Sequence, residues 1–330
     1  MRIIVDLLGS DLGPIELVKG VCEDAKESKA SYTLIGPEKD LREELGKLGA
    51  DLSRFEFIDC NEYITNEDQP VRAIRRKKDS STVIGLNKLN EEGYDGFISA
   101  GSTGGLLAGG LFITKRIDNV ERAVITAELP TEKGKAILAD TGAVMDSTPE
   151  MQVQYAKMGS LYVKHVLGKD KPRVALLNVG AEEGKGDMRA KKTFDLLKGE
   201  ENINFVGNIE ARYALSGQAD VIVADGFAGN VLLKSIEGVA SLLMKEIKTG
   251  IMSSIRGKLG GLLAKPAFKG IAKKYNYKEV GAALLLGIKK PVFKAHGSSD
   301  AKAMKSALLI AEKIINSNVV HYIEEEFKND

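Results

Sequence analysis

The feature that most constrains this chain is a regular alternation of short, apolar, β-rich runs with longer helical stretches. Such runs occur at residues 3–5, 32–35, 55–58, 96–99, 136–139, 174–178, 204–206 and 221–223. Alternation of this kind is typical of βαβ units, whose strands join in a mostly parallel sheet. The sequence therefore predicts an α/β fold, and its 330 residues suffice for one large domain or two intimate lobes.

Small and polar residues follow several of these runs. In a doubly wound sheet, the carboxyl ends of the strands gather at one edge, where ligands bind. Glycine there permits close approach of the backbone, and the amino ends of the following helices offer N–H groups to an anion. A single glycine loop also serves as a plain tight corner, but the loops together predict a phosphate-binding crevice. They are residues 6–11, 99–104, 140–142, 178–180 and 224–226.

The charge balance and the cysteines exclude several classes of protein. Lys and Arg total 47 and Asp and Glu total 46, so a net charge of +1 offers no global attraction for nucleic acid. Cys22 and Cys60 show no spacing typical of a metal site or a disulfide framework. The chain starts with a strand-like run, not a signal peptide, and no apolar run approaches the ~18 residues of a membrane span. We expect a cytoplasmic protein with reduced thiols.

Several catalytic motifs are absent. The sequence has no GxxxxGK[ST] and no GxSxG, which disfavours an ordinary nucleotide triphosphatase and a covalent acyl-serine enzyme. The glycine loops also lack the GxGxxG spacing after the first strand, so a nicotinamide dehydrogenase loses its main support.

Residues 240–278 differ from the rest of the chain. Positions 245–278 hold nine Lys or Arg and a single acid, Glu246, interleaved with apolar residues. This pattern predicts two amphipathic helices, broken near Gly260–Gly261 and Pro266. A basic face beside exposed apolar residues suits either reversible docking on an anionic membrane or packing against a second subunit. The sequence leaves both open.

Two loops contain candidate catalytic residues. In Lys294-Ala-His-Gly-Ser-Ser-Asp300, one of Ser298, Ser299 and Asp300 can cap the helix that begins near Ala301. Capping leaves His296 unexplained, and a histidine there suits general acid–base work or donation to an oxyanion. The glycine-rich loop 178–187 carries Lys185, which either holds phosphate, polarises a carbonyl or is simply solvated.

A run of basic residues follows Gln69. At helical spacing Arg72, Arg75 and Arg76 share one face, which suits a phosphate, a pantetheine phosphate or the acidic surface of a carrier protein. Charge runs are often only solvated faces.

Over essentially its whole length the chain resembles the PlsX family of phosphate acyltransferases. The segments that carry this resemblance are Pro70-Val-Arg-Ala-Ile-Arg-Arg-Lys-Lys78, Leu176-Leu-Asn-Val-Gly180, Phe205-Val-Gly-Asn-Ile-Glu-Ala-Arg212, Ala224-Asp-Gly-Phe-Ala-Gly-Asn230 and Lys294-Ala-His-Gly-Ser-Ser-Asp300. The resemblance implies conversion of long-chain acyl-(acyl carrier protein) and inorganic phosphate to acyl phosphate, for phospholipid synthesis, with no metal or cofactor.

The resemblance also implies an architecture and partners. The fold would be a three-layer α/β/α sandwich like that of phosphate acetyltransferase and the isopropylmalate dehydrogenase group. We expect a single catalytic domain over residues 1–330, with residues 240–278 projecting toward a dimer partner and the membrane. Partners would be acyl carrier protein, phosphate, a second copy of the chain and a downstream acyltransferase that uses acyl phosphate. The protein would sit in the cytoplasm, peripherally on the membrane.

The resemblance places the site on the loops that end the strands. We expect phosphate to attack the thioester carbonyl directly, while Lys185 or His296 stabilises the tetrahedral oxyanion. Arg72, Arg75 and Arg76 would meet the carrier protein or phosphate. The expected substrate and phosphate ligands are Asp6, Gly9, Ser10, Asp11, Gly101, Ser102, Thr103, Gly104, Asp225, Gly226, Asn230, Gly297, Ser298, Ser299 and Asp300.

Three positions depart from the family pattern. Leu12 stands where the family has His, and Ser102 and Val144 stand where it has Asn. Two other functions therefore stay open: a short-chain phosphate acyltransferase, and an inactive membrane scaffold that binds carrier protein.

Overall fold

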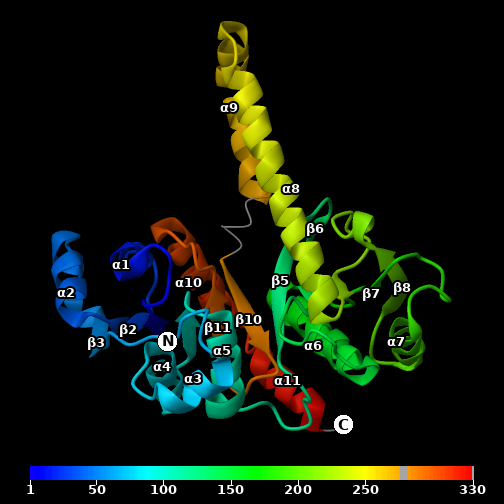
Figure 1. Cartoon of the computed structure of the whole chain (residues 1–330), viewed down its shortest axis with the longest axis horizontal. Helices are drawn as coiled ribbons and strands as arrows, with labels where there is room; N and C mark the ends of the chain where they lie inside the picture. Colours follow the sequence, from blue (N-terminus) through cyan, green and yellow to red (C-terminus); the bar gives the residue numbers. More distant parts are fainter. Residues whose placement is uncertain (276–280, 329–330) are drawn as a thin grey trace.

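The computed structural model describes residues 1–275 and 281–328 and is built around one sheet of 11 strands (Figure 1). Its strand order is β3-β2-β1-β4-β11-β10-β5-β6-β9-β7-β8. The strands are β1 (Arg2–Asp6), β2 (Ser31–Gly36), β3 (Phe55–Asp59), β4 (Gly96–Ser99), β5 (Val124–Thr131), β6 (Gly134–Ala139), β7 (Val174–Asn178), β8 (Phe205–Glu210), β9 (Val221–Val223), β10 (Ala282–Leu286) and β11 (Val292–Ala295).

Helices pack on both faces of this sheet, so the predicted α/β fold is confirmed. The α-helices are α1 (Gly13–Ala25), α2 (Glu38–Lys47), α3 (Pro70–Arg76), α4 (Ser81–Leu89), α5 (Thr103–Gly109), α6 (Pro149–Leu167), α7 (Met188–Gly199), α8 (Gly226–Met252), α9 (Ile255–Tyr275), α10 (Ala301–Asn316) and α11 (Val319–Lys328). A π-turn at Gly110–Thr114 extends α5, and short 3₁₀ turns cover Leu52–Arg54 and Ala211–Tyr213.

The inner parallel strands are buried on both faces. In β1, Ile3, Ile4 and Val5 are each 0% exposed, and the same holds for all of Val221–Val223 in β9. Continuous apolar runs of this kind are typical of strands covered by helices on both sides. These strands could be predicted from the sequence because the apolar runs are short and end at turn residues.

The centre of the sheet is antiparallel, and the sequence did not predict it. β5 pairs with β6 and β10, and β10 pairs with β11, all antiparallel. β5 carries Glu128 and Pro130, which mask its strand pattern, and an apolar run such as that of β10 cannot be told from a buried helix by periodicity alone. These missed strands join the two parallel halves of the sheet.

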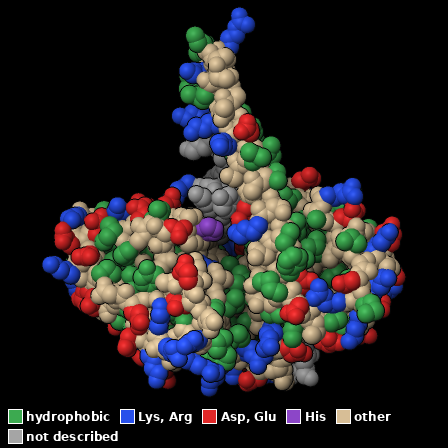
Figure 2. Space-filling model, viewed as in Figure 1, with side chains coloured by type: hydrophobic (Ala, Val, Ile, Leu, Met, Phe, Trp, Pro, Cys, Tyr) green, Lys and Arg blue, Asp and Glu red, His purple; other side chains and the backbone are tan. Residues whose placement is uncertain are grey.

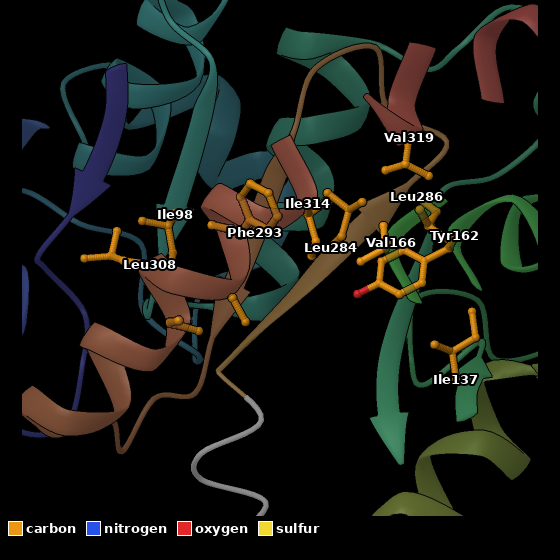
Figure 3. Close-up of a cluster of buried hydrophobic side chains, with 14 of the residues drawn as sticks. Ile98, Ile137, Tyr162, Val166, Leu284, Leu286, Phe293, Leu308, Ile314 and Val319 are labelled. Atoms are coloured by element: carbon orange, nitrogen blue, oxygen red, sulfur yellow. The ribbon is translucent and has the colours of Figure 1, made fainter. Parts of the chain in front are cut away.

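One hydrophobic cluster crosses that junction. Phe293 of β11, Leu284 of β10 and Ile137 of β6 belong to the same buried cluster, which α10 covers with Leu308 and which α1, α6 and α11 also join (Figure 3). A second cluster lies under α4 and α5. Burial of so many apolar side chains across the junction holds the two halves together.

Helices α8 and α9 project from the body as a hairpin (Figure 1). The sequence placed this hairpin at residues 240–278, whereas α8 begins at Gly226 and the chain turns at Ser253. The expected break at Gly260–Gly261 and Pro266 is wrong, because α9 runs through all three. Ser254 explains the turn, since its Oγ accepts a hydrogen bond from Gly257 N (3.0 Å) and caps α9. Residues 276–278 of the predicted segment lie outside the described residues.

Among the described residues, α8 alone has the length and apolar composition to cross a bilayer, and 6% of that apolar window is buried. Lys and Arg side chains gather along the hairpin and at its tip (Figure 2).

Candidate active site

A cleft of about 420 Å³ lies where the two halves of the sheet meet, at the base of the hairpin. Figure 2 shows the side of the molecule on which the two halves meet below the hairpin. Loops after β1, β4 and β11 form one wall, β5 and β10 form the floor, and the first turns of α8 form the other wall. Its position at strand ends, between two halves of an α/β sheet, is typical of ligand sites.

Three loops meet in the first wall through their backbones. Gly9 has φ +74, and a Cβ built there would lie 3.1 Å from the Cα of Gly101. Asp11 N donates to the carbonyl of Gly297 (2.9 Å). A side chain at Gly9 would push this loop away from Gly101, so Gly9 serves close approach as well as turning.

Lys294 is the cation of this cleft wall. It lies on β11, and its Nζ donates to the carbonyl of Ala100 (3.1 Å) and to that of Ala295. Burial lowers the pKa of Lys294 to about 8, and the nearby Asp6 and Asp11 carboxylates counter part of that effect. Both of these hydrogen-bond acceptors are neutral carbonyl oxygens. A phosphate or an oxyanion that enters the cleft could therefore give this ammonium a negatively charged partner.

Asp6 anchors the wall from beneath. Its carboxylate accepts hydrogen bonds from Ser99 Oγ (2.8 Å), Thr82 Oγ1 (3.1 Å) and Leu8 N (3.1 Å), all in the buried interior. Burial raises its pKa, and these hydrogen bonds oppose the shift. Asp6 therefore holds the loop after β1 against β4 and contributes negative charge below Lys294.

His296 lines the cleft two residues after Lys294. Its Nδ1 lies 2.9 Å from Ser298 Oγ and accepts a hydrogen bond from Ser298 N (3.2 Å). Burial, followed by the charge of Lys234, lowers its pKa. Nδ1 acts as the acceptor for Ser298 N, which in a neutral ring puts the proton on Nε2.

The opposite wall is held by Asp140, which is buried after β6. Its carboxylate accepts hydrogen bonds from the backbone of Ala143 (2.9 Å) and Val144 (2.7 Å), and burial raises its pKa. A Cβ at Gly226 would lie 2.6 Å from the same carboxylate, and a Cβ at Gly229 would collide with the Asp140 carbonyl. These two glycines let the start of α8 sit directly on this loop.

The structure brings some predicted site residues to the cleft and places others around it. Those that line it are Gly9, Asp11, Gly101, Thr103, Asn230, His296 and Gly297.

The remaining loop residues have structural contacts. Ser10, Ser102, Asp225 and Asp300 accept hydrogen bonds from the backbone of Gly13, Gly105, Ala228 and Ala303 respectively.

Three others have packing roles. Gly104 packs against Pro70, Ser299 Oγ donates to the carbonyl of His296 (2.7 Å), and Ser298 orients the same imidazole. These three residues do not line the cleft themselves, but the two serines support His296, which does.

Lys185 lies on an exposed loop and does not line the cleft. Its backbone N–H donates to Glu182 O (3.1 Å), and its carbonyl accepts from Asn178 Nδ2 (3.2 Å). The sequence singled out this loop for its glycines and charges, but the strand before it, β7, lies toward the far end of the sheet.

The basic residues Arg72, Arg75 and Arg76 line a separate hollow at the start of α3. All three are exposed, and the Arg75 guanidinium lies 5.8 Å from the ring of Phe112, which is 54% exposed. This surface adjoins the cleft, because Asn66 lines the cleft and Pro70 contacts Gly104.

Sequence reasoning missed the role of Lys294, the contribution of β5 and β10, and the α8 residues beyond Asn230. Thr126 and Glu128 reach the cleft from β5, and Lys234 and Glu237 reach it from α8. Lys294 was visible in the sequence as a lone lysine in an apolar run, Val292–Ala295, directly before His296. That run was not recognised as a strand, so the lysine had no predicted position.

The model of the family described as "Fatty acid synthesis protein" matches residues 1–322. A curated phosphate acyltransferase of Caldicellulosiruptor bescii is 45% identical over 99% of this chain and 98% of its own length. Another, from Brevibacillus brevis, is 44% identical over 100% of the chain and 98% of its length. The chain belongs to the PlsX family of phosphate acyltransferases. It is therefore an acyltransferase, and the resemblance seen in its motifs is confirmed.

Solved structures share the fold of this PlsX-family chain at low sequence identity. A phosphotransacetylase from Streptococcus pyogenes matches with a TM-score of 0.63 and 17% identity, covering 96% of this chain and 94% of its own. A branched-chain phosphotransacylase from Enterococcus faecalis V583 matches with a TM-score of 0.59 and 15% identity, covering 96% and 99%. The predicted relation to the phosphate acetyltransferase fold is confirmed.

Proposed function

We propose that this chain transfers a long acyl group from acyl carrier protein to inorganic phosphate, and so supplies acyl phosphate for phospholipid synthesis. The observation that carries the proposal is the cleft at the sheet junction, where Lys294 and His296 face glycine loops in a chain of the PlsX family. A buried ammonium, an imidazole and closely approaching backbone suit an anion that attacks a carbonyl.

Phosphate would bind against the loop Gly101–Thr103, with its negative charge beside Lys294. Because inorganic phosphate is already an anion at neutral pH, it needs no general base to attack. The cleft would hold it next to the thioester carbon, and positioning would supply much of the rate. A phosphate oxygen would form the new bond to the carbonyl carbon, and the carbon–sulfur bond would break to release the carrier thiolate.

His296 would serve the developing charge. Its Nε2–H, fixed by the hydrogen bonds at Nδ1, can donate to the tetrahedral oxyanion or to the departing sulfur. Lys294 would take the part that the sequence assigned to Lys185, since Lys294 and not Lys185 lines the cleft.

Acyl carrier protein would dock on the surface formed by Arg72, Arg75, Arg76 and the exposed Phe112. Guanidinium groups beside an aromatic ring suit an acidic partner that also offers apolar contact. The surface adjoins the cleft, so a pantetheine arm would have a short path from the docked carrier to Lys294.

The hairpin would make the two remaining contacts, with a second copy of the chain and with the membrane surface. Val239, Leu242 and Leu243 on α8 are each more than half exposed, and Leu259 and Leu263 on α9 are 61% and 84% exposed. Apolar residues beside clustered lysines suit either partner. The protein would thus work in the cytoplasm, held peripherally at the membrane, where a second acyltransferase uses its product.

The deciding test is a phosphate-dependent deacylation assay of long-chain acyl carrier protein, with trapping of acyl phosphate. We expect Lys294→Met to lower kcat/KM by at least about 100-fold, the order of loss seen when an oxyanion donor is removed. Lys185→Met is the matched control, and we expect it to stay within about threefold. A larger loss in the Lys185 variant than in the Lys294 variant would overturn the assignment of the cation.

A second candidate function is short-chain phosphate acyl transfer. The departures at Leu12, Ser102 and Val144 motivate it, because each lies within two residues of one that lines the cleft. The same assay with acetyl and palmitoyl thioesters separates the two functions. Faster turnover of acetyl than of palmitoyl thioester would replace the long-chain proposal.

A further inference from the structure

The sheet opens between β5 and β10. Only two residue pairs join these strands, Leu285 with Ile125 and Leu286 with Val124. One residue further, Thr126 Oγ1 still reaches the carbonyl of Leu284 (3.3 Å). Beyond that point the strands separate toward the base of α8 (Figure 1), and the cleft enters the opening.

Small and apolar side chains line this opening. Ala127 of β5 and Ala283 of β10 face it from the two strands, Ile125 lies at its floor, and Leu233 of α8 closes its side. These four residues define the β5–β10 trough. Ala127 and Ala283 are half-buried, so their methyl groups are accessible from the cleft. A larger residue at either position would fill the space that the splayed strands leave.

The charged groups around the trough already have hydrogen-bond or ion-pair partners. Glu128 accepts hydrogen bonds from Tyr162 OH (2.9 Å) and Lys135 Nζ (2.5 Å), one at each carboxylate oxygen. Lys234 and Glu237 form an ion pair on α8 (2.7 Å). An alkyl chain could therefore enter the trough without breaking these hydrogen bonds. This is favourable because burial of an unpaired charge costs free energy.

We propose that the β5–β10 trough holds the alkyl chain of the acyl substrate and sets the chain-length preference. The inference rests on the proposed function and deepens it. The trough is continuous with the cleft wall that carries Lys294 and His296, so a carbonyl placed there leaves its alkyl chain directed between the strands. Each methylene that leaves water would favour binding about fourfold.

The test fills the trough and compares chain lengths. Butyryl and dodecanoyl groups are presented on the same carrier protein, so that docking stays constant. We expect Ala127→Leu and Ala283→Leu to lower kcat/KM for the dodecanoyl thioester at least about tenfold, while butyryl turnover stays within about twofold. Ala211→Leu, on an exposed 3₁₀ turn, adds the same side chain elsewhere and should change neither.

Two outcomes of this assay would overturn the proposal: equal losses for both chain lengths, as expected if the trough instead holds the pantetheine arm, and no loss for either. Retained butyryl turnover shows that a variant is folded. Should both leucine variants fail to fold, Ala283→Val carries the same expectation with a smaller selective loss.

A binding measurement separates failure of the trough from failure of the proposed function. Calorimetry compares dodecyl phosphate, below its micelle concentration, with ethyl phosphate. We expect the unaltered protein and Ala211→Leu to bind dodecyl phosphate at least about tenfold more tightly, and Ala127→Leu to lose that preference. Preferential binding without any turnover would refute the transferase proposal alone. Equal affinities of the unaltered protein for both ligands would refute the trough.

Discussion

The body of the molecule and the α8–α9 hairpin both contain many apolar side chains, but the body buries them and the hairpin exposes them. In the body, Phe293 and Leu284 are at most 1% exposed, whereas Leu262 and Leu263 on the hairpin are 67% and 84% exposed. Of the 27 residues of α8, only Gly226, Gly229 and Leu232, all near its start, are buried. Apolar side chains in the body stabilise the fold. Leu262 and Leu263 lie largely in water within one chain, and exposed apolar residues of this kind often mark an interaction surface.

The largest expected difference comes from truncating an apolar side chain in each region. Phe293→Ala should lower the free energy of unfolding by about 3–5 kcal/mol, because it leaves a cavity across the sheet junction. Leu263→Ala should change it by less than about 0.5 kcal/mol, because the side chain is already in water. Denaturant unfolding measures both. A loss above about 2 kcal/mol for Leu263→Ala would mean that the hairpin leucines are buried in solution.

A second comparison uses two glycines of the same helix. Gly229→Ala should lower the free energy of unfolding by at least about 2 kcal/mol, since its Cβ would collide with the Asp140 carbonyl. A Cβ at Gly250 would meet nothing within 4 Å. Gly250→Ala should therefore increase the stability of the helix by up to about 1 kcal/mol. Thermal unfolding followed by circular dichroism checks both signs. Equal effects would contradict the contrast between the start of α8 and its projecting part.

The third comparison concerns buried and exposed lysines. The folded-state pKa of Lys294 is about 8, below its ordinary value of 10.5, so the unfolded chain binds more protons between these pH values. Stability should therefore rise with pH across this window, by about 3 kcal/mol for this group at ~1.4 kcal/mol per pKa unit. Lys294→Met should remove that increment. Lys258→Met, on the exposed face of α9, is the matched control variant. Parallel profiles for all three proteins would refute the burial of this ammonium.

The smallest expected difference is between two helix caps. Asp300 accepts a hydrogen bond from Ala303 N (2.8 Å) at the start of α10, whose apolar face packs in the body core. Asp300→Ala should cost about 1 kcal/mol of global stability. Ser254→Ala, at the start of α9, should leave global stability unchanged within about 0.3 kcal/mol and speed amide exchange only within the hairpin. Global destabilisation by Ser254→Ala would show that the hairpin folds as one unit with the body.

The sequence by itself determined the features that depend on local pattern. Continuous apolar runs marked the parallel strands, glycines marked the loops that approach one another, and interleaved lysines and leucines marked the hairpin. His296 was found in this way too, because its loop directly precedes the start of α10 and its motif is specific to the family. Each of these signals is contained in a few neighbouring residues.

The tertiary structure decided what depends on distant pairing. Only the fold shows that β5, β10 and β11 join the two halves, that Lys294 lines the cleft while Lys185 does not, and that Ala127 and Ala283 flank an opening. These residues are separated by more than a hundred positions or lie in runs without a distinctive period, so no local pattern predicts their proximity. Burial and strand order, which arise from the whole chain at once, determined the site that the local motifs had only outlined.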